Sequence, residues 1–223
     1  MGLKLKIPVK VNTIKLQQVI SVAFDPGFAN GGWAIIAAER QMDNTWKVLD
    51  VRYGIIETRK PPKKQRGIMR VSSEDQIRID SIVEQSEQVL TWAQDRANKA
   101  ETETNLNVVI IAGLEWFTAF QGAGGAKTGI VLGYIYTRLK RFAHYVFAWL
   151  PSDTKREICG NYKASKEEVF TTIGDILGID IEEGHKELWG TKLLVNQREH
   201  VGDALSLAYM NFDEYKRVAL SRE

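Results

Sequence analysis

The run NVVIIAGLEWF, at residues 107–117, constrains the fold of this chain more than any other stretch. Its apolar residues are continuous instead of alternating, and several of them are β-branched. Such a run is typical of a strand that other elements cover on both faces. We therefore expect a sheet between two layers of other structure. The run also carries a carboxylate, Glu115, which is out of place in an apolar core.

The segments before this run predict antiparallel strands. VISVAFD, at 19–25, is followed by a Pro-Gly turn and by a second apolar run, GGWAIIAA. WKVLDVRYGIIE, at 46–57, supplies a third β-rich segment. Together they predict a three-stranded meander over residues 18–57.

The rest of the chain is mostly helical in pattern, with one short predicted strand, VFAWLP. Apolar residues recur at helical spacing in four segments: 73–99, 129–146, 163–179 and 199–215. The predicted order is βββ-α-β-α-β-α-α. It indicates a mixed five-stranded sheet flanked by helices, which is an α/β three-layer fold.

Basic residues cluster outside these elements. The N-terminal arm is basic, and the segment 59–70 holds six Lys or Arg residues and two prolines without an acid. Prolines break regular structure there. We expect a basic arm, 1–17, one domain, 18–215, with a basic insertion at 59–70, and a C-terminal tail, 216–223.

Charge and composition exclude several classes of protein. The formal net charge is only +2, so the charge of the whole chain does not by itself indicate a polyanionic partner. The single cysteine, Cys159, cannot form an internal disulfide and has no partner for a zinc site, which favours a reducing compartment. The apolar run VVIIAGL is far shorter than the roughly 18 residues of a membrane span. We expect a cytoplasmic protein with no membrane partner.

Four ionisable residues stand in or beside strongly apolar segments. Asp25 ends the first predicted strand, Glu115 ends the fourth, and His200 and Asp203 are three residues apart on the last predicted helix. If the first and fourth strands are adjacent and parallel, a helix across their ends brings all four side chains together. Converging carboxylates repel one another unless a cation neutralises them. The pattern indicates metal-assisted displacement at phosphorus, with two hard cations, Mg²⁺ or Mn²⁺, on oxygen ligands.

Each of these residues also has a purely structural interpretation. Asp25 precedes a Pro-Gly pair and can hold a turn through its own backbone. His200 can be a capping or interfacial histidine, and Asp203 can be an exposed helical acid. The order of the four along the chain favours the common site.

Several of these motifs resemble those of the RuvC family of Holliday-junction resolvases, within the ribonuclease H-like superfamily. FDPGFANGGWAII, VVIIAGLEWF and REHVGDALSLAY resemble, in order, the family's strand-one Asp-Pro-Gly, strand-four Glu and C-terminal His/Asp-x-x-Asp-Ala. TKREICGNYKASKEEV is similar to the segment in which a lysine, a glycine and a second lysine precede a helix. The resemblance covers about residues 19–212 and implies a ribonuclease H-like three-layer fold.

The resemblance implies a homodimeric endonuclease that cuts opposing strands of a four-way DNA junction symmetrically and leaves 5′-phosphate ends. It implies two Mg²⁺ or Mn²⁺ ions as cofactors. The resemblance assigns catalysis and metal binding to four residues: Asp25, Glu115, His200 and Asp203. Among them, His200 either binds metal or positions water.

Residues that contact DNA follow partly from the resemblance and partly from charge. The resemblance assigns DNA contact to Lys155 and Lys166, and it assigns an aromatic side chain that enters the junction to Trp116, Phe117 or Phe120. Clustered charge on a loop repels itself unless a polyanion is near, so we also expect phosphate contacts from basic residues: Lys63, Lys64, Arg66 and Lys127.

The chain also departs from the family. Three segments are longer than in a compact bacterial housekeeping resolvase: the arm, the basic insertion and the extended segment before the last helix. They suggest a divergent member of phage or mobile-element origin, in a bacterial or phage-infected cell. Alternative functions are a ribonuclease H-like nuclease for branched or flap DNA or RNA–DNA hybrid, and a junction-binding protein with weak catalysis. An actin- or sugar-kinase-like ATPase needs a duplicated domain, for which 223 residues are short.

The glycine-rich stretch QGAGGAKTG does not fit a nucleotide-binding P-loop. Counted back from Lys127, the two required glycines fall on Gln121 and Ala126. We interpret the stretch as a flexible DNA-facing loop before a helix, because backbone amides at a helix start favour phosphate.

Overall fold

The computed structural model describes residues 17–43, 45–58, 71–116 and 122–219. Five strands form one mixed sheet in the order β3-β2-β1-β4-β5. The pairs β1–β2 and β2–β3 are antiparallel, and the pairs β1–β4 and β4–β5 are parallel. The strands are β1, Gln18–Asp25; β2, Asn30–Arg40; β3, Trp46–Glu57; β4, Val108–Glu115; and β5, Tyr145–Trp149.

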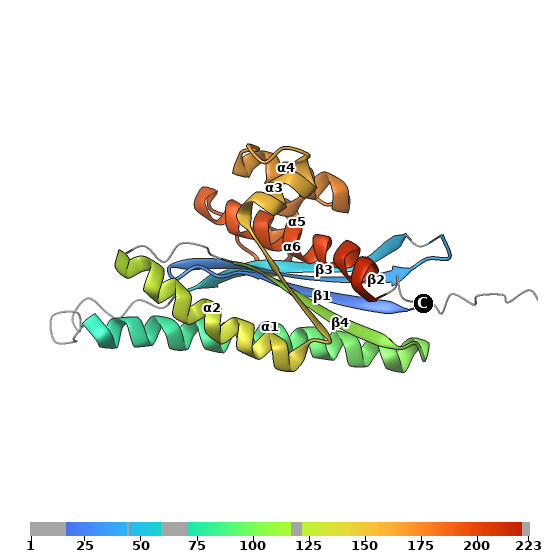
Figure 1. The fold of residues 1–223 in the computed structure, drawn as a ribbon, viewed down its shortest axis with the longest axis horizontal. Helices are drawn as coiled ribbons and strands as arrows, with labels where there is room; N and C mark the ends of the chain where they lie inside the picture. Colours follow the sequence, from blue (N-terminus) through green and yellow to red (C-terminus); the bar gives the residue numbers. More distant parts are fainter. Residues whose placement is uncertain (1–16, 44, 59–70, 117–121, 220–223) are drawn as a thin grey trace, which may run out of the picture.

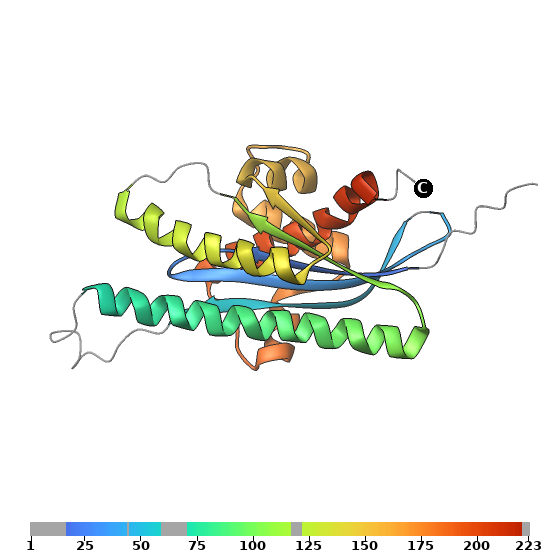
Figure 2. The ribbon, with the colours of Figure 1, turned by 60° about the horizontal axis from the view of Figure 1, so that its bottom comes forward.

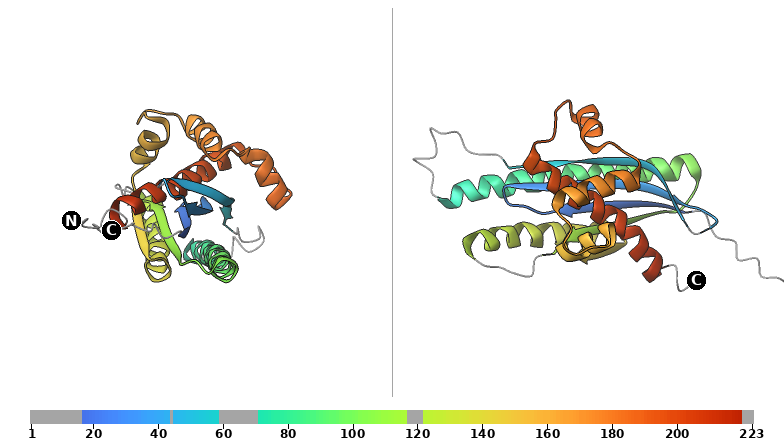
Figure 3. Two further views of the ribbon diagram at one scale, coloured as in Figure 1. Left: turned by 90° about the vertical axis from the view of Figure 1, so that its right-hand side faces the viewer. Right: turned by 90° about the horizontal axis from the view of Figure 1, so that it is seen from above.

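Helices cover both faces of the sheet. Figures 1 and 2 show α1 and α2 along one face, and the end-on view in Figure 3 shows the remaining helices gathered on the other. The α/β three-layer prediction is therefore confirmed. The helices are α1, Val71–Thr104; α2, Gly122–Phe142; α3, Pro151–Cys159; α4, Lys166–Leu177; α5, Ile181–Trp189; and α6, Val195–Ala219.

The central strands β1 and β4 lie between two apolar cores. Phe24 and Leu114 are fully buried in the core that α1 and α2 complete, whereas Val19 and Ile111 are fully buried in the core beneath α6. Each such side chain contributes about 1.5–3 kcal/mol when it leaves water. The continuous apolar run of β4 thus reflects burial on both faces, as the sequence predicted.

Several parts of the expected domain organisation stay predictions. The arm up to residue 16 and the insertion 59–70 lie outside the described residues. At the other end, α6 continues to Ala219, so the first residues of the expected tail belong to this helix. In the part of the chain that the structure describes, no helix is both long and apolar enough to cross a membrane.

The sequence pattern does not predict α3 and α5. Each has nine residues, too few for helical periodicity to stand out. Local signals define their starts instead. Pro151 occupies the first turn of α3, and the side chain of Asp180 accepts hydrogen bonds from the backbone N–H groups of Glu182 and Glu183 at the start of α5.

The glycine-rich stretch after β4 also differs from its interpretation as a loop. It is helical from Gly122 onward, because α2 begins there. Glycine disfavours a helix by about 1 kcal/mol per residue, so tertiary contacts must support this turn. The Lys127 Nζ atom lies 2.8 Å from Oδ2 of Asp75 on α1 and 5.4 Å from the ring centroid of Phe28. These contacts join the start of α2 to α1 and to the turn after β1.

The last helix packs directly on the backbone of β2. A Cβ atom on Gly32 would lie 1.9 Å from the carbonyl oxygen of His200, so this contact leaves no room for a side chain. Gly32 is also the partner of Asp25 in the β1–β2 ladder. The same contact therefore sets the distance between Asp25 and α6.

We predict that Gly32→Ala destabilises the protein by about 1–3 kcal/mol, because the added methyl group forces two backbones apart. Gly133→Ala is the matched control, since a Cβ atom there meets nothing within 4 Å. That variant should stabilise α2 by up to about 1 kcal/mol. Denaturant unfolding measures both, and equal free energies of unfolding would contradict the close packing of α6 on β2.

Candidate active site

The register of the sheet places Asp25 beside Glu115. β1 and β4 run parallel with Phe24 opposite Leu114, and each strand ends at the next residue. The two carboxylates therefore meet at one edge of the sheet, where both are buried: Asp25 is 5% exposed and Glu115 is 7% exposed. The predicted adjacency and direction of these two strands are confirmed.

α6 brings His200 and Asp203 to the same edge. The two residues lie one turn apart on this helix, which packs across β1, β2 and β4. His200 Nδ1 lies 2.6 Å from Asp25 Oδ2, within hydrogen-bonding distance. The side chain of Asp203 is only 14% exposed. The structure thus gathers all four side chains that the sequence singled out, which we call the acidic cluster.

The carboxyl groups of the acidic cluster are too crowded for all of them to be charged. Burial raises the pKa of Glu115 to about 9, and the charges of Asp25 and Asp203 and a hydrogen bond with Asp25 add to the shift. Burial likewise raises the pKa of Asp203 to about 7, together with the charge of Asp25. At neutral pH Glu115 therefore keeps its proton unless positive charge is added.

Two basic side chains offset part of this negative charge. Burial alone would lower the pKa of His200, but the hydrogen bond to Asp25 and nearby carboxylates raise it overall. Lys166 Nζ lies 3.0 Å from Glu199 Oε2 and 4.0 Å from Asp203 Oδ2. Its pKa is also raised, since these carboxylates outweigh the effect of burial. Lys166 therefore lies at the acidic cluster as well as on the surface predicted to meet DNA.

Sequence reasoning missed Glu199. This residue comes directly before His200 on α6, and its Oε1 atom lies 3.8 Å from His200 Nε2. Its spacing of four from Asp203 puts both acids on one side of the helix, which the sequence could have revealed. Its pairing with Lys166 depends on how α4 packs on α6 and had no such signal.

The donor chemistry of the acidic cluster fits a hard divalent cation. It offers two buried carboxyl groups, a third that is 14% exposed, and one imidazole, and Mg²⁺ and Mn²⁺ prefer such oxygen-rich sites. Positive charge would also lower the raised pKa values of Glu115 and Asp203. Within the described residues, no three His, Cys, Asp or Glu side chains are already arranged to hold an ion. In this arrangement His200 bonds Asp25 and Lys166 faces Asp203.

The other residues predicted to contact DNA are spread over the molecule. Lys155 lies half-buried on α3, and Lys127 is paired with Asp75 as described above. Trp116 follows Glu115, is 37% exposed, and meets Tyr136 edge to face with ring centroids 5.8 Å apart. Five of the predicted residues lie outside the described residues: Lys63, Lys64, Arg66, Phe117 and Phe120.

Comparison with solved structures identifies the fold. Thermus thermophilus RuvC is 17% identical and has a TM-score of 0.50, over 90% of this chain and 95% of that chain. The same protein in complex with a Holliday junction substrate is 16% identical and has a TM-score of 0.49, over 91% of this chain and 96% of that chain. The yeast mitochondrial Holliday junction resolvase Ydc2 is 14% identical and has a TM-score of 0.42, over 91% of this chain and 84% of that chain.

Sequence comparison adds nothing to this result, because no family model and no curated protein matches the chain. The similarity to RuvC extends over nearly the whole length of both chains. The fold is therefore the ribonuclease H-like fold of RuvC, as the sequence motifs implied.

The raised pKa of Glu115 makes the stability of the cation-free protein depend on pH. Glu115 titrates near 9 in the folded protein and near its ordinary 4.5 when unfolded, so folding takes up a proton between these values. The free energy of unfolding should fall as pH rises through this range, by at most about 1.4 kcal/mol per pH unit. Glu115→Gln should weaken this dependence. Denaturant titrations in EDTA at about pH 6 and about pH 8.5 measure the effect.

Glu101→Gln, at an exposed position of α1, is the matched control and should keep the wild-type pH dependence. Added Mn²⁺ should stabilise the wild type more than Glu115→Gln at the higher pH, because an ion that binds only the folded state adds to its stability. A wild-type protein that does not lose stability over this range would contradict a protonated Glu115.

Proposed function

We propose that this protein is a structure-selective DNA endonuclease that resolves four-way junctions by metal-dependent phosphodiester hydrolysis. The observation that carries the proposal is the acidic cluster, in which buried Asp25 and Glu115 and the largely covered Asp203 lie together at the end of two central strands of a ribonuclease H-like sheet. Buried like charges cost stability, so a requirement for them is the simplest reason for their presence. The RuvC-like motifs supply the substrate class.

The residues of the cluster have distinct proposed roles. Asp25 and the helical pair His200 and Asp203 would hold one Mg²⁺ or Mn²⁺ ion, and Asp25 and Glu115 would hold a second. Such ions supply positive charge to the transition state of phosphate displacement and activate water. The bond between Asp25 and His200 Nδ1 fixes the imidazole ring, and the other ring nitrogen, Nε2, would either bind the ion or position the attacking water. The products would carry 5′-phosphate ends.

The proposed role of Lys166 depends on whether cations neutralise the carboxylates of the acidic cluster. Its ammonium group balances Asp203 and Glu199 in the structure. When cations neutralise the carboxylates, this group becomes available to a DNA phosphate at the cut. Lys155 and the basic insertion would contribute further phosphate contacts away from the cluster.

A symmetric pair of cuts requires two active sites, and the described residues of one chain hold one acidic cluster. We therefore propose that the protein works as a homodimer on the junction. A nuclease for flap DNA or for RNA–DNA hybrids would use the same cluster, so the choice of substrate in the assay below separates these possibilities.

We predict that Asp203→Asn slows junction cleavage by roughly a hundredfold or more, because loss of even an outer-shell partner of a metal ligand costs 10- to 100-fold. DNA binding should remain, since a negative charge near phosphate is removed. Asp213→Asn is the matched control, as Asp213 is exposed on the same helix. The assay uses labelled four-way junctions, duplex, flap and hybrid with Mg²⁺, Mn²⁺ or Ca²⁺. Equal cleavage by Asp203→Asn and wild type would overturn the proposed site.

We predict that Lys166→Met slows cleavage and lowers the slope of log affinity against log salt by about one, as expected for one phosphate contact. Lys99→Met serves as control, because Lys99 is an exposed lysine of α1 whose pair with Glu103 lies within that helix. Binding is measured across a salt series with Ca²⁺ present. An unchanged slope together with unchanged cleavage would mean that Lys166 only balances Asp203 and Glu199.

A further inference from the structure

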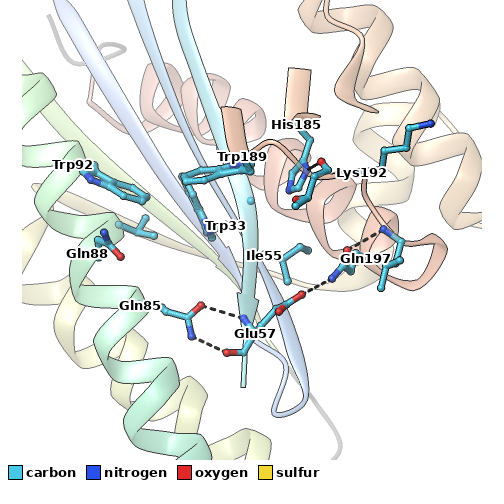
Figure 4. A pocket seen from close by; sticks show the side chains of 14 residues that line it. Trp33, Ile55, Glu57, Gln85, Gln88, Trp92, His185, Trp189, Lys192 and Gln197 are labelled. Carbon is cyan, nitrogen blue, oxygen red and sulfur yellow. Dashed lines mark hydrogen bonds between the residues drawn. The ribbon is translucent and has the colours of Figure 1, made fainter. Parts of the chain in front are cut away.

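A pocket of about 490 Å³ lies on the β3 side of α6, apart from the acidic cluster. Figure 4 shows side chains from α1, from the end of β3, from α5 and from the start of α6 converging on it. Its size is in the range of small-ligand sites. Three tryptophans line it, Trp33, Trp92 and Trp189, and the sequence analysis assigned none of them to a functional site.

The three tryptophans form one rigid aromatic wall. Trp33 lies 5.5 Å from Trp92 and 5.9 Å from Trp189 between ring centroids, and Trp92 lies 5.7 Å from Trp189. Trp189 Nε1 donates a 2.8 Å hydrogen bond to the carbonyl oxygen of Tyr53, which fixes the indole ring. Trp33 is buried, but Trp189 is 40% exposed. The wall therefore presents an aromatic surface to solvent that is already held in place.

Polar groups line the opposite parts of the pocket. Gln85 and Gln197 are held by Glu57: Gln85 bonds the Glu57 backbone, and Gln197 Nε2 donates to Glu57 Oε1 at 2.8 Å. Gln88 and Lys192 also line the pocket, and neither side chain makes a hydrogen bond or ion pair with another described residue. The pocket thus combines a fixed aromatic wall with an available amide and an available ammonium group.

The pocket adjoins the acidic cluster through two shared elements. Gln197 lines the pocket one helical turn before His200 on α6, about 4.5 Å along the axis. Ile55, which also lines the pocket, pairs with Gly32 on β2, and Gly32 pairs with Asp25, so two strand spacings of about 4.8 Å separate Ile55 from Asp25. A DNA strand with its phosphate at the acidic cluster would therefore pass the mouth of the pocket within a nucleotide or so.

We propose that this pocket binds one unpaired nucleobase of the DNA substrate, from a nucleotide next to the phosphodiester that is cut. The proposal rests on the proposed nuclease function and adds to it a base-binding site. A nucleobase matches the lining, because its face stacks on indole rings and its edge pairs with a side-chain amide such as Gln88. Lys192 is suited to the adjoining phosphate. Unstacked bases are available at a branch point, where pairing is already interrupted.

The test compares junctions that differ by one base. Affinity is measured by fluorescence anisotropy, with Ca²⁺ present, for an intact four-way junction and for junctions that each lack one base near the branch point. For one abasic position the wild type should lose about 5- to 150-fold in affinity, the range measured for single base–aromatic stacks. Trp189→Leu and Gln88→Ala should bind the intact junction more weakly and should no longer distinguish it from that abasic junction.

Trp46→Leu is the matched control, because Trp46 lies at the other end of β3 and packs on Phe212. It should keep the wild-type response to base removal. Comparison of intact and abasic DNA within each variant separates a local effect from a loss of fold. A variant Trp189→Leu that still distinguishes the two junctions as the wild type does would overturn the proposal.

Two further outcomes would also overturn it. In the first, a free deoxynucleotide quenches tryptophan fluorescence saturably, while base removal from the junction has no effect on affinity. The occupant of the pocket would then be a free nucleotide. In the second, the wild type binds the intact junction and every abasic junction with equal affinity, which would show that no base enters the pocket. If the wild type instead fails to prefer junctions over duplex, the proposed function fails, and intact and abasic single strands then test the pocket alone.

Discussion

The parallel pairing of β1 with β4 is the constraint on which the rest of the structure depends. It ends two buried strands at one edge of the sheet, and the last side chain of each is a carboxylate. Asp25 is 5% exposed and Glu115 is 7% exposed, so little of either residue meets bulk water. The negative charge must therefore be neutralised on site, by a proton, by a basic side chain or by a cation.

The protein offers the first two of these solutions from its own chain. Glu115 holds a proton, His200 bonds Asp25, and Lys166 stands beside Asp203. In the proposed function, a divalent cation would take the place of the proton and of the ammonium group. Without added positive charge, the crowded carboxyl groups cost stability.

α6 connects the acidic cluster to the rest of the molecule. Its contact with Gly32 fixes its height above the sheet, and Asn211 further along accepts a hydrogen bond from Trp149 Nε1 and donates one to Ser21. The helix therefore holds its register on both β1 and β5. Because Gln197 and His200 project from successive turns of this fixed helix, the aromatic pocket and the acidic cluster keep a constant separation.

The strands, their apolar faces and the acids at their ends could be predicted from the sequence, because these are local patterns of period and residue type. The sequence also indicated the ribonuclease H-like fold, since the order of Asp25, Glu115, His200 and Asp203 is a property of the chain. It could not reveal the pairing of Lys166 with Glu199 or the wall formed by Trp33, Trp92 and Trp189, because these residues come from distant elements. The helices α3 and α5 were also missed, as nine residues are too few for periodicity to appear. Only tertiary packing decides which side chains of separate helices meet, and here it decided both the charge balance and the pocket.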